Sequence, residues 1–167
     1  EKKIRDKALL LVGFSGGFRR SELVNIEHED IEFVTEGVKI FVKRSKTDQS
    51  GEGMTKAIPY FDNENFCPVK TLKMWVELAK LKNGKIFNIS DKSVALIIKK
   101  YANYAGLNSQ KYAGHSLRSG FATSTAESGA EERSIMAMTG HKSTEMVRRY
   151  IKEANLFKNN ALNKIKL

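Results

Sequence analysis

Three short segments of the chain concentrate side chains that could act on a phosphate ester. GFRRSEL places Arg19 after a glycine pair and before an expected helix. GHSLRSG holds His115 and Arg118 three residues apart, a spacing that puts both side chains on one face of a helix. HKSTEMVRRY begins with His141 and ends on Tyr150 nine residues later. The five residues are therefore candidates for one site.

Arginine, histidine and tyrosine together suit phosphoryl transfer. A phosphodiester under attack gains negative charge on its non-bridging oxygens, and guanidinium groups can contact that charge bidentately. A tyrosine phenol, whose ordinary pKa is about 10, can be the nucleophile when its proton is removed in a cationic setting. A deoxyribose 5′ oxygen is a poor leaving group and needs a general acid. Lys46, in the polar segment RSKTDQ, is a candidate for that acid.

The charge balance predicts a polyanionic partner. The chain of 167 residues has 29 Lys and Arg against 19 Asp and Glu, a formal net charge of +10. A basic surface gains affinity for nucleic acid by releasing condensed counterions. An anionic membrane is the competing partner, but no long amphipathic basic helix and no run of about 20 apolar residues supports it. A basic protein without either partner remains the alternative.

The residue pattern argues against a metal site. Cys67 is the one cysteine, which excludes an internal disulfide and disfavours a cysteine-based zinc site. No carboxylate lies at ligand spacing from His115 or His141, and His28 lies in the acidic stretch EHED, typical of a surface loop. We therefore expect no metal and no cofactor. The cysteine usage and an N-terminal segment unlike a signal sequence predict a cytoplasmic location.

Hydrophobic periodicity predicts one mostly helical α+β domain with a small antiparallel sheet inserted early. IEFV, VKIFVK and residues 56–60 are the expected strands of that three-stranded sheet. Trp75, Phe121, Met136 and Met138 fall at helical spacing and are expected in the core. The expected helices are residues 3–14, SELVNI, PVKTLKMWVELAKL from Pro68, DKSVALIIKKYANYAG, HSLRSGFATSTAES, EERSIMAMT and KSTEMVRRYIKEA.

The three segments resemble the motifs of the tyrosine recombinases, the phage-integrase family, and the resemblance covers essentially the whole chain as a catalytic domain. GFRRSEL is similar to the first-arginine motif, which implies that Arg19 is catalytic and that Glu22 supports the site. GHSLRSG matches the His-x-x-Arg motif, and TGHKSTEMVRRY matches the Gly-His motif that precedes the nucleophile by nine residues. Lys46 lies in the sheet region where the family keeps a loop lysine, with Lys43 and Lys56 as alternatives.

This resemblance implies a mechanism. Tyr150 attacks the scissile phosphate, becomes joined to the DNA 3′ phosphate and releases a 5′ hydroxyl. Arg19 and Arg118 stabilise the charged transition state, and His141 adds a hydrogen bond. His115 accepts or positions the tyrosine proton, while the loop lysine protonates the departing oxygen. A 5′ hydroxyl from another strand then reverses the reaction, so neither a metal nor ATP is implied.

The resemblance also implies partners and a domain arrangement. Residues 1–167 are expected to be a single catalytic domain of a longer protein, because the family's N-terminal core-binding domain has no room ahead of Arg19. The expected partner is double-stranded DNA. The full-length protein is expected to bind it as a homotetramer, whereas this catalytic part alone could be a monomer. Residues 156–167 are expected to form a tail that could be exchanged between subunits. The KTDQ and VRRY segments favour an integrase of a phage or other mobile element, associated with the nucleoid.

Two other functions stay open at this stage. A type IB topoisomerase uses a similar set of residues to nick and reseal one strand, although the short Gly-His-to-Tyr segment and the small size favour the recombinase. A non-catalytic DNA-binding module is the more distant alternative. Tyr101, Tyr104 and Tyr112 are rival nucleophiles, but none follows a Gly-His pair. Arg148 and Arg149 are interpreted as solvated or phosphate-contacting neighbours of the tyrosine.

Overall fold

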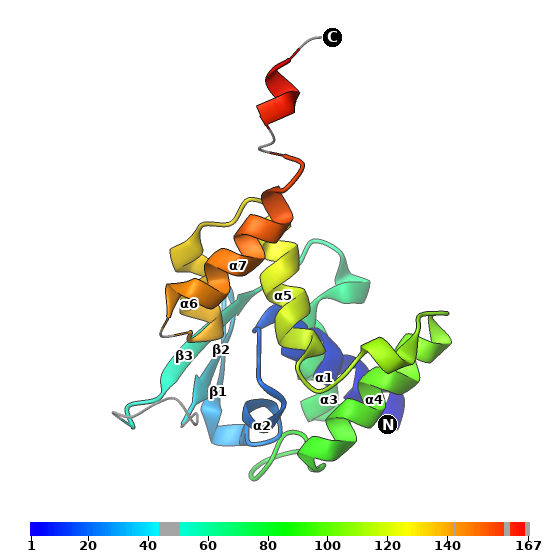
Figure 1. Ribbon diagram of the computed structural model, residues 1–167. Helices are drawn as coiled ribbons and strands as arrows, with labels where there is room; N and C mark the ends of the chain where they lie inside the picture. The colour runs from blue at the N-terminus through cyan, green and yellow to red at the C-terminus, as the bar shows by residue number, and fades with distance from the viewer. Residues whose placement is uncertain (44–50, 142, 159–160, 166–167) are drawn as a thin grey trace.

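The sheet and helices expected from the sequence are arranged as Figure 1 shows. The computed structural model describes residues 1–43, 51–141, 143–158 and 161–165. Its elements are α1 (Lys2–Ser15), α2 (Arg20–Leu23), η1 (His28–Asp30), β1 (Ile31–Val34), β2 (Gly37–Val42), β3 (Met54–Pro59), η2 (Glu64–Phe66), α3 (Pro68–Leu78), α4 (Asp91–Tyr104), η3 (Ser109–Lys111), α5 (Ser116–Glu127), α6 (Glu132–Thr139), α7 (Thr144–Asn155) and η4 (Ala161–Lys164), where η denotes a 3₁₀ helix. The predicted mostly helical α+β fold is confirmed.

The sheet has the strand order β1-β2-β3, and both neighbouring pairs are antiparallel. Val38, Ile40 and Val42 of β2 face the core, while the residues between them are exposed, as two-residue alternation requires. β3 begins at Met54, two residues before the predicted start of the third strand. Lys56 therefore lies inside β3, at a core-facing position opposite Ile40.

Several helices begin or end at the residues that the sequence marks. Pro68 occupies the first turn of α3, where its missing N–H costs no hydrogen bond. Ser90 caps α4, with its hydroxyl accepting from the backbone N–H of Ser93 at 3.2 Å. Gly140 ends α6 in the left-handed conformation, with φ of 66°. The second helix is shorter than predicted, because α2 ends at Leu23.

Two groups of buried apolar side chains stabilise the fold. Cluster A joins α1, the sheet, α3 and α4 through residues such as Leu9, Ile40 and Leu72. Cluster B joins α5, α6 and α7 and consists of Phe121, Ala122, Ala126, Ile135 and Val147. The expected packing roles are confirmed: Phe121 belongs to cluster B, Trp75 packs against cluster A, Met136 packs against cluster B, and Met138 contacts both.

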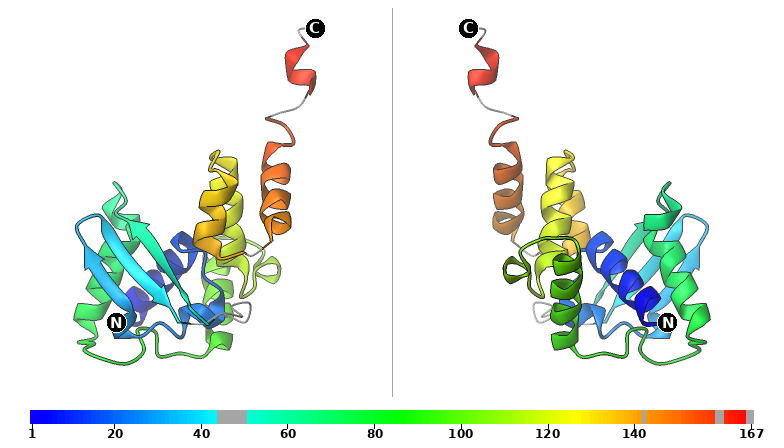
Figure 2. Two further views of the ribbon diagram at one scale, coloured as in Figure 1. Left: turned by 90° about the vertical axis from the view of Figure 1, so that its left-hand side faces the viewer. Right: turned by 90° about the vertical axis from the view of Figure 1, so that its right-hand side faces the viewer.

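The two clusters divide the molecule into two parts that meet beside the turn between α1 and α2. Figure 2 shows the sheet on one side and the helices α5 to α7 on the other. A Cβ added to Gly17, in that turn, would lie 2.9 Å from the ring of Phe121, a member of cluster B. The first-arginine segment is therefore held against α5, which carries Arg118.

The chain after α7 leaves the packed helices, as both figures show. Lys158 Nζ donates to the Glu127 carbonyl at the end of α5. Phe157 and Leu162 are 85% and 69% exposed, and η4 contributes no buried residue. The described part of the tail therefore presents apolar side chains to solvent.

Among all the residues that the structure describes, no helix is long and apolar enough to cross a membrane.

Candidate active site

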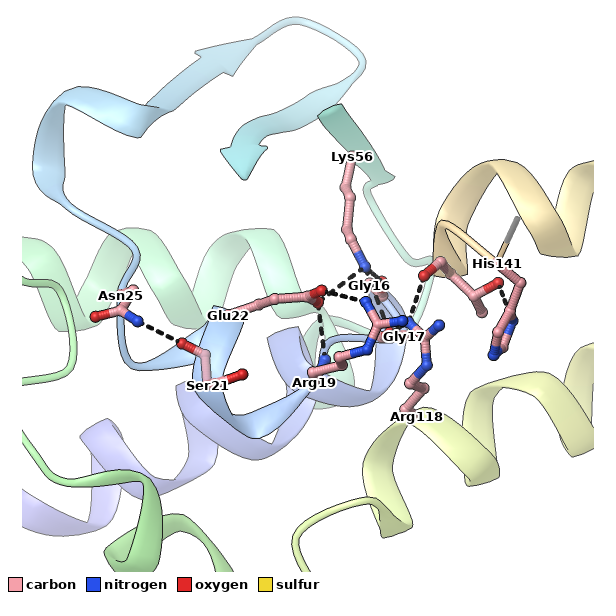
Figure 3. A network of polar contacts seen from close by, with 10 residues as sticks. Gly16, Gly17, Arg19, Ser21, Glu22, Asn25, Lys56, Arg118 and His141 are labelled. Carbon is pink, nitrogen blue, oxygen red and sulfur yellow. Dashed lines mark hydrogen bonds and ion pairs between the residues drawn. The ribbon is translucent and has the colours of Figure 1, made fainter. Parts of the chain in front are cut away.

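Arg19 is presented by the turn between α1 and α2. Gly17 has φ of 55°, a left-handed conformation that favours glycine, and it directs the chain into α2. The Arg19 guanidinium donates from Nη1 to Glu22 Oε1 at 2.7 Å, and its backbone N–H donates to Glu22 Oε2 at 2.9 Å. The buried Glu22 carboxylate thus holds both the side chain and the backbone of Arg19 (Figure 3).

Arg118 reaches the same turn from α5. Its Nη1 donates to the Gly17 carbonyl at 3.0 Å and to the Thr139 carbonyl. The residue is 6% exposed, and burial, followed by the charge of Arg19, lowers the pKa of its guanidinium to about 10. Arg118 is therefore charged at neutral pH. Its Nη2 is buried and has no hydrogen-bond partner in the described part of the chain, which leaves a donor available for an anion.

His141 directly follows the left-handed Gly140 and lies beside Arg118 (Figure 3). Its Nδ1 is 2.8 Å from the Thr139 hydroxyl. Burial first, and then the positive charges of Arg118 and Arg19, lower the pKa of the imidazole to about 4. His141 is consequently neutral near pH 7.

Tyr150 lies on α7, which packs against α5 and α6. The ring is partly buried against cluster B, and the phenol donates to the Ser119 hydroxyl at 3.4 Å. The charge that the phenol carries when ionised is among the influences that raise the pKa of Arg118, so the two side chains are electrostatic neighbours. The structure thus brings Arg19, Arg118, His141 and Tyr150 together from the α1–α2 turn, α5, the end of α6 and α7.

The two remaining candidates are placed differently. His115 is the N-cap residue of α5, and its side chain is exposed and makes no hydrogen bond or ion pair with a described residue. It therefore lies one turn before Arg118, outside the network in Figure 3. Lys46 lies outside the described residues, so its predicted role as general acid stays a prediction.

The two alternatives to Lys46 have contrasting surroundings. Lys43 ends in solvent and forms ion pairs with Glu27 at 2.6 Å and Glu29 at 2.7 Å, and their carboxylates raise the pKa of its ammonium. Lys56 is fully buried, and its Nζ donates to the Gly16 carbonyl at 2.8 Å. Lys56 is therefore enclosed by the fold, whereas Lys43 is exposed and engaged in surface ion pairs.

The other arginines and tyrosines near the motifs have ordinary partners. Arg148 pairs with Glu132 at 3.0 Å and Arg149 pairs with Glu153 at 3.2 Å, and both arginine side chains are largely exposed. They are therefore solvated neighbours of Tyr150, as expected. Within the residues described, no group of three or more His, Cys, Asp or Glu side chains is placed to hold a metal ion.

The motif comparison did not name Thr139 or Ser119 as site residues, and it named Lys56 only as an alternative to Lys46. Thr139 contacts His141, Ser119 contacts Tyr150, and Lys56 contacts the turn that precedes Arg19. A signal existed for Lys56 alone, because in β3 it stands where the alternation with Ile58 calls for an apolar side chain.

Comparison with known proteins identifies relatives of the chain in sequence and in fold. The family described as "Phage integrase family" matches residues 1–156. The integrase/recombinase xerD homolog of Selenomonas ruminantium is 49% identical over 97% of this chain and 51% of that protein. A crystal structure of XerA recombinase has a TM-score of 0.75 at 22% identity and covers 99% of this chain and 58% of its own. The XerH site-specific recombinase bound to palindromic difH substrate, a post-cleavage complex, has a TM-score of 0.69 at 21% identity, over 95% of this chain and 47% of its own.

These comparisons differ in what they support. The chain spans about half the length of the relatives it matches. At 21% and 22% identity, the two solved structures establish the fold. The family match covers all the segments that carry Arg19, Arg118, His141 and Tyr150.

Proposed function

The chain belongs to the phage integrase family, and we propose that it is the catalytic part of a site-specific tyrosine recombinase that cleaves and rejoins DNA strands. In the cleavage step, the phenol oxygen of Tyr150 forms a bond to the scissile phosphorus and loses its proton. The bond from phosphorus to the deoxyribose 5′ oxygen breaks, and that oxygen receives a proton. The product is a 3′-phosphotyrosyl link and a free 5′ hydroxyl.

The observation that carries this proposal is that Nη2 of Arg118 has no hydrogen-bond partner among the residues that the structure describes. A buried guanidinium nitrogen without an acceptor costs free energy unless a ligand supplies one. Arg19 lies beside it, and its guanidinium is held by Glu22. The pair can therefore bind the non-bridging oxygens of one phosphodiester, with donors fixed before the charge develops.

The remaining roles follow from position. His141 is neutral before DNA binds and borders both arginines, so it adds no charge to their mutual repulsion in the free protein. A bound phosphate favours the second proton, with which the ring can donate to that phosphate. His115 stands one helical turn from Arg118, exposed at the start of α5, and we assign it to the tyrosine proton. Lys46 is assigned to protonation of the leaving 5′ oxygen. Glu22 supports Arg19 and is not placed to touch the substrate.

Rejoining runs the same step in reverse. A 5′ hydroxyl from a second strand attacks the phosphotyrosyl link and releases Tyr150, so the number of phosphoester bonds is conserved. We propose double-stranded DNA as the partner and a tetramer of the full-length protein as the working assembly. Exchange of the tail between subunits is supported by its apolar side chains, which are exposed to solvent and not buried against their own domain: Phe157, Leu162 and Ile165. On the KTDQ and VRRY segments, we further propose that the protein serves a phage or other mobile element within the cytoplasm.

Trapping the covalent intermediate tests the proposed chemistry. The probe is a pool of short labelled duplexes of randomised sequence, each nicked so that cleavage releases a fragment too short to stay paired. Loss of that fragment prevents rejoining, and denaturing electrophoresis then shows DNA attached to protein. We expect the parent chain to form the adduct in the presence of EDTA, and Tyr150→Phe to form none while remaining folded.

Tyr104→Phe is the matched control, because Tyr104 is 73% exposed on α4. It should form as much adduct as the parent chain. Adduct formation by Tyr150→Phe at the parental level would refute the assignment of the nucleophile. Strict dependence on a divalent ion would point to another class of nuclease. Relaxation of supercoiled DNA without joining of two duplexes would favour the topoisomerase alternative.

A further inference from the structure

Lys56 is a fully buried lysine with a defined set of contacts. Its side chain has an exposed fraction of 0%. The Nζ atom donates to the Gly16 carbonyl at 2.8 Å and lies 3.4 Å from the Gly17 carbonyl. It is also 3.8 Å from Glu22 Oε2 and 4.4 Å from the centre of the Phe18 ring. All of these partners belong to the turn between α1 and α2 or to α2 itself.

An ammonium group at this buried position destabilises the folded state relative to an apolar side chain. The neighbouring core-facing residues, Ile40 and Ile58, are apolar and buried, and burying a charge without full compensation costs several kcal/mol. Burial is the main cause that lowers the pKa of Lys56 to about 7; Glu22 opposes the shift, while Arg118 and Arg19 add to it. An apolar residue would fill β3 at lower cost, which indicates a role outside packing.

The contacts of Lys56 are shared with both arginines of the site. The Gly17 carbonyl accepts from Arg118 as well as facing Lys56. Glu22 Oε1 accepts from the Arg19 guanidinium, while Oε2 accepts from the Arg19 backbone N–H and faces Lys56. Lys56 is therefore joined, through one intervening group in each case, to the two guanidinium groups that would bind the phosphate (Figure 3).

We propose that Lys56 is a positioning residue: it fastens β3 to the Gly16–Gly17 turn and to Glu22, and thereby fixes Arg19 and Arg118 relative to each other. The proposal rests on the proposed function of the site. It also removes Lys56 as an alternative to Lys46, because a buried ammonium bound to backbone carbonyls cannot deliver a proton to the leaving oxygen. Its effect on cleavage is transmitted through the two arginines.

A sulfur leaving group separates the two roles. Replacing the 5′ bridging oxygen of the nicked duplex with sulfur creates a thiolate leaving group, which needs no general acid because an ordinary thiol has a pKa of about 8.5. The variants are Lys56→Met, which removes the ammonium, and Lys56→Arg, which keeps donors and charge but cannot release a proton at neutral pH. Lys39→Met, on the exposed side of β2, is the control for loss of a strand lysine.

The positioning role predicts that the sulfur substrate does not restore the rate of adduct formation by Lys56→Met. We expect adduct formation to fall by about tenfold to a hundredfold on both substrates, since a small misplacement of catalytic groups has effects of this order. If Lys56→Met fails to fold, Lys56→Arg carries the test. Restoration of either variant to the parental rate by the sulfur substrate would overturn the proposal and make Lys56 the acid. Unchanged cleavage of the oxygen substrate by Lys56→Met would overturn it as well.

Hydrogen exchange gives a readout that does not depend on cleavage. The backbone N–H groups of Gly16, Gly17 and Phe18 donate to carbonyls of α1, so they should exchange slowly in the parent chain. In the Lys56 variant that folds, we expect exchange of these groups to accelerate by about tenfold, the effect of losing roughly one hydrogen bond, with no change in α4. Unchanged exchange in this turn would overturn the positioning role. If the parent chain forms no adduct at all, the proposed function fails, and hydrogen exchange alone decides the role of Lys56.

Discussion

The phenol of Tyr150 and the hydroxyl of Ser119 lie 3.4 Å apart, across the packing interface of α7 and α5. Ser119 directly follows Arg118 on α5, so consecutive residues of one helix contact the predicted nucleophile and the predicted phosphate site. The distance exceeds the usual 2.5–3.0 Å of an O–H···O hydrogen bond. The contact therefore orients the phenol without holding it tightly, as suits the proposed nucleophile.

Ser119→Ala should slow formation of the covalent adduct by about three- to tenfold, which corresponds to about 1 kcal/mol, the usual net value of one hydrogen bond. The free energy of unfolding should change by less than about 0.5 kcal/mol. Single-turnover cleavage of the nicked duplex and chemical denaturation measure the two effects. Ser124→Ala, an exposed change on the same helix, is the matched control. Equal rates for the two variants would show that Tyr150 does not use Ser119.

Thr139 and His141 form a second local pair with consequences for pH. The Thr139 hydroxyl donates to the Ile135 carbonyl at 2.9 Å and lies 2.8 Å from His141 Nδ1. A hydroxyl has one proton and a carbonyl only accepts. While Thr139 donates to Ile135, Nδ1 must carry the imidazole proton, so Nε2 of the neutral ring is an acceptor. A phosphate at Nε2 then favours uptake of a second proton.

DNA binding is accordingly predicted to raise the pKa of His141 from its low value of about 4 in the free protein. The sign follows from charge: the phosphate stabilises the imidazolium, so binding takes up a proton and DNA affinity increases as the pH falls toward that pKa. NMR titration of the histidine ring protons of Tyr150→Phe, with and without duplex DNA, measures the shift. His28, on η1, serves as the internal control. A His141 that titrates near 6.5 in the free protein would contradict both its burial and its position beside the two arginines.

Most of the fold was predictable because it depends on local patterns. Local residues determine several elements: the alternation in VKIFVK predicts β2, Pro68 marks the start of α3, and Gly140 marks the end of α6. The start of β3 was placed two residues late, at Lys56, because Met54 and Thr55 directly follow a polar, glycine-rich stretch that indicates a loop. Tertiary packing overrides the local pattern there.

The site was predictable only where a motif names a residue. Arg118 and His141 come from motif spacing, and the structure places them beside each other. Ser119 and Thr139 could not be found in this way, because a hydroxyl acquires its partner only when separate helices pack. His115 shows the opposite case. Helical spacing predicted that it shares a face with Arg118, but it is the N-cap residue of α5 and its side chain is exposed.

Gly17→Ala should destabilise the protein and slow cleavage. At φ of 55°, an added Cβ is strained by the backbone and would lie 2.9 Å from the Phe121 ring and 3.3 Å from the Thr139 methyl group. We expect a loss of about 2–4 kcal/mol in the free energy of unfolding, from backbone strain and overpacking together. Gly106→Ala is the control, because Gly106 has φ of 73° but no atom within 4 Å of an added Cβ. For Gly106→Ala, denaturation should show a loss of about 1 kcal/mol in the free energy of unfolding. Equal losses in the two variants would disprove the close contact of Gly17 with Phe121 and Thr139.

The buried ammonium of Lys56 predicts how stability depends on pH. Its pKa is lowered by burial from the ordinary value of 10.5 to about 7 in the folded chain. Between these values the unfolded chain holds a proton that the folded chain has released, so this group makes the folded state more stable as the pH rises. The stability of the parent relative to Lys56→Met should therefore increase from about pH 7 to about pH 10, by at most about 1.4 kcal/mol per pH unit. Denaturation at several pH values, with Lys39→Met as the control, measures the difference. A difference that does not vary with pH would mean that the ammonium is hydrated in the folded chain, and the buried contacts that join β3 to Arg19 and Arg118 would be wrong.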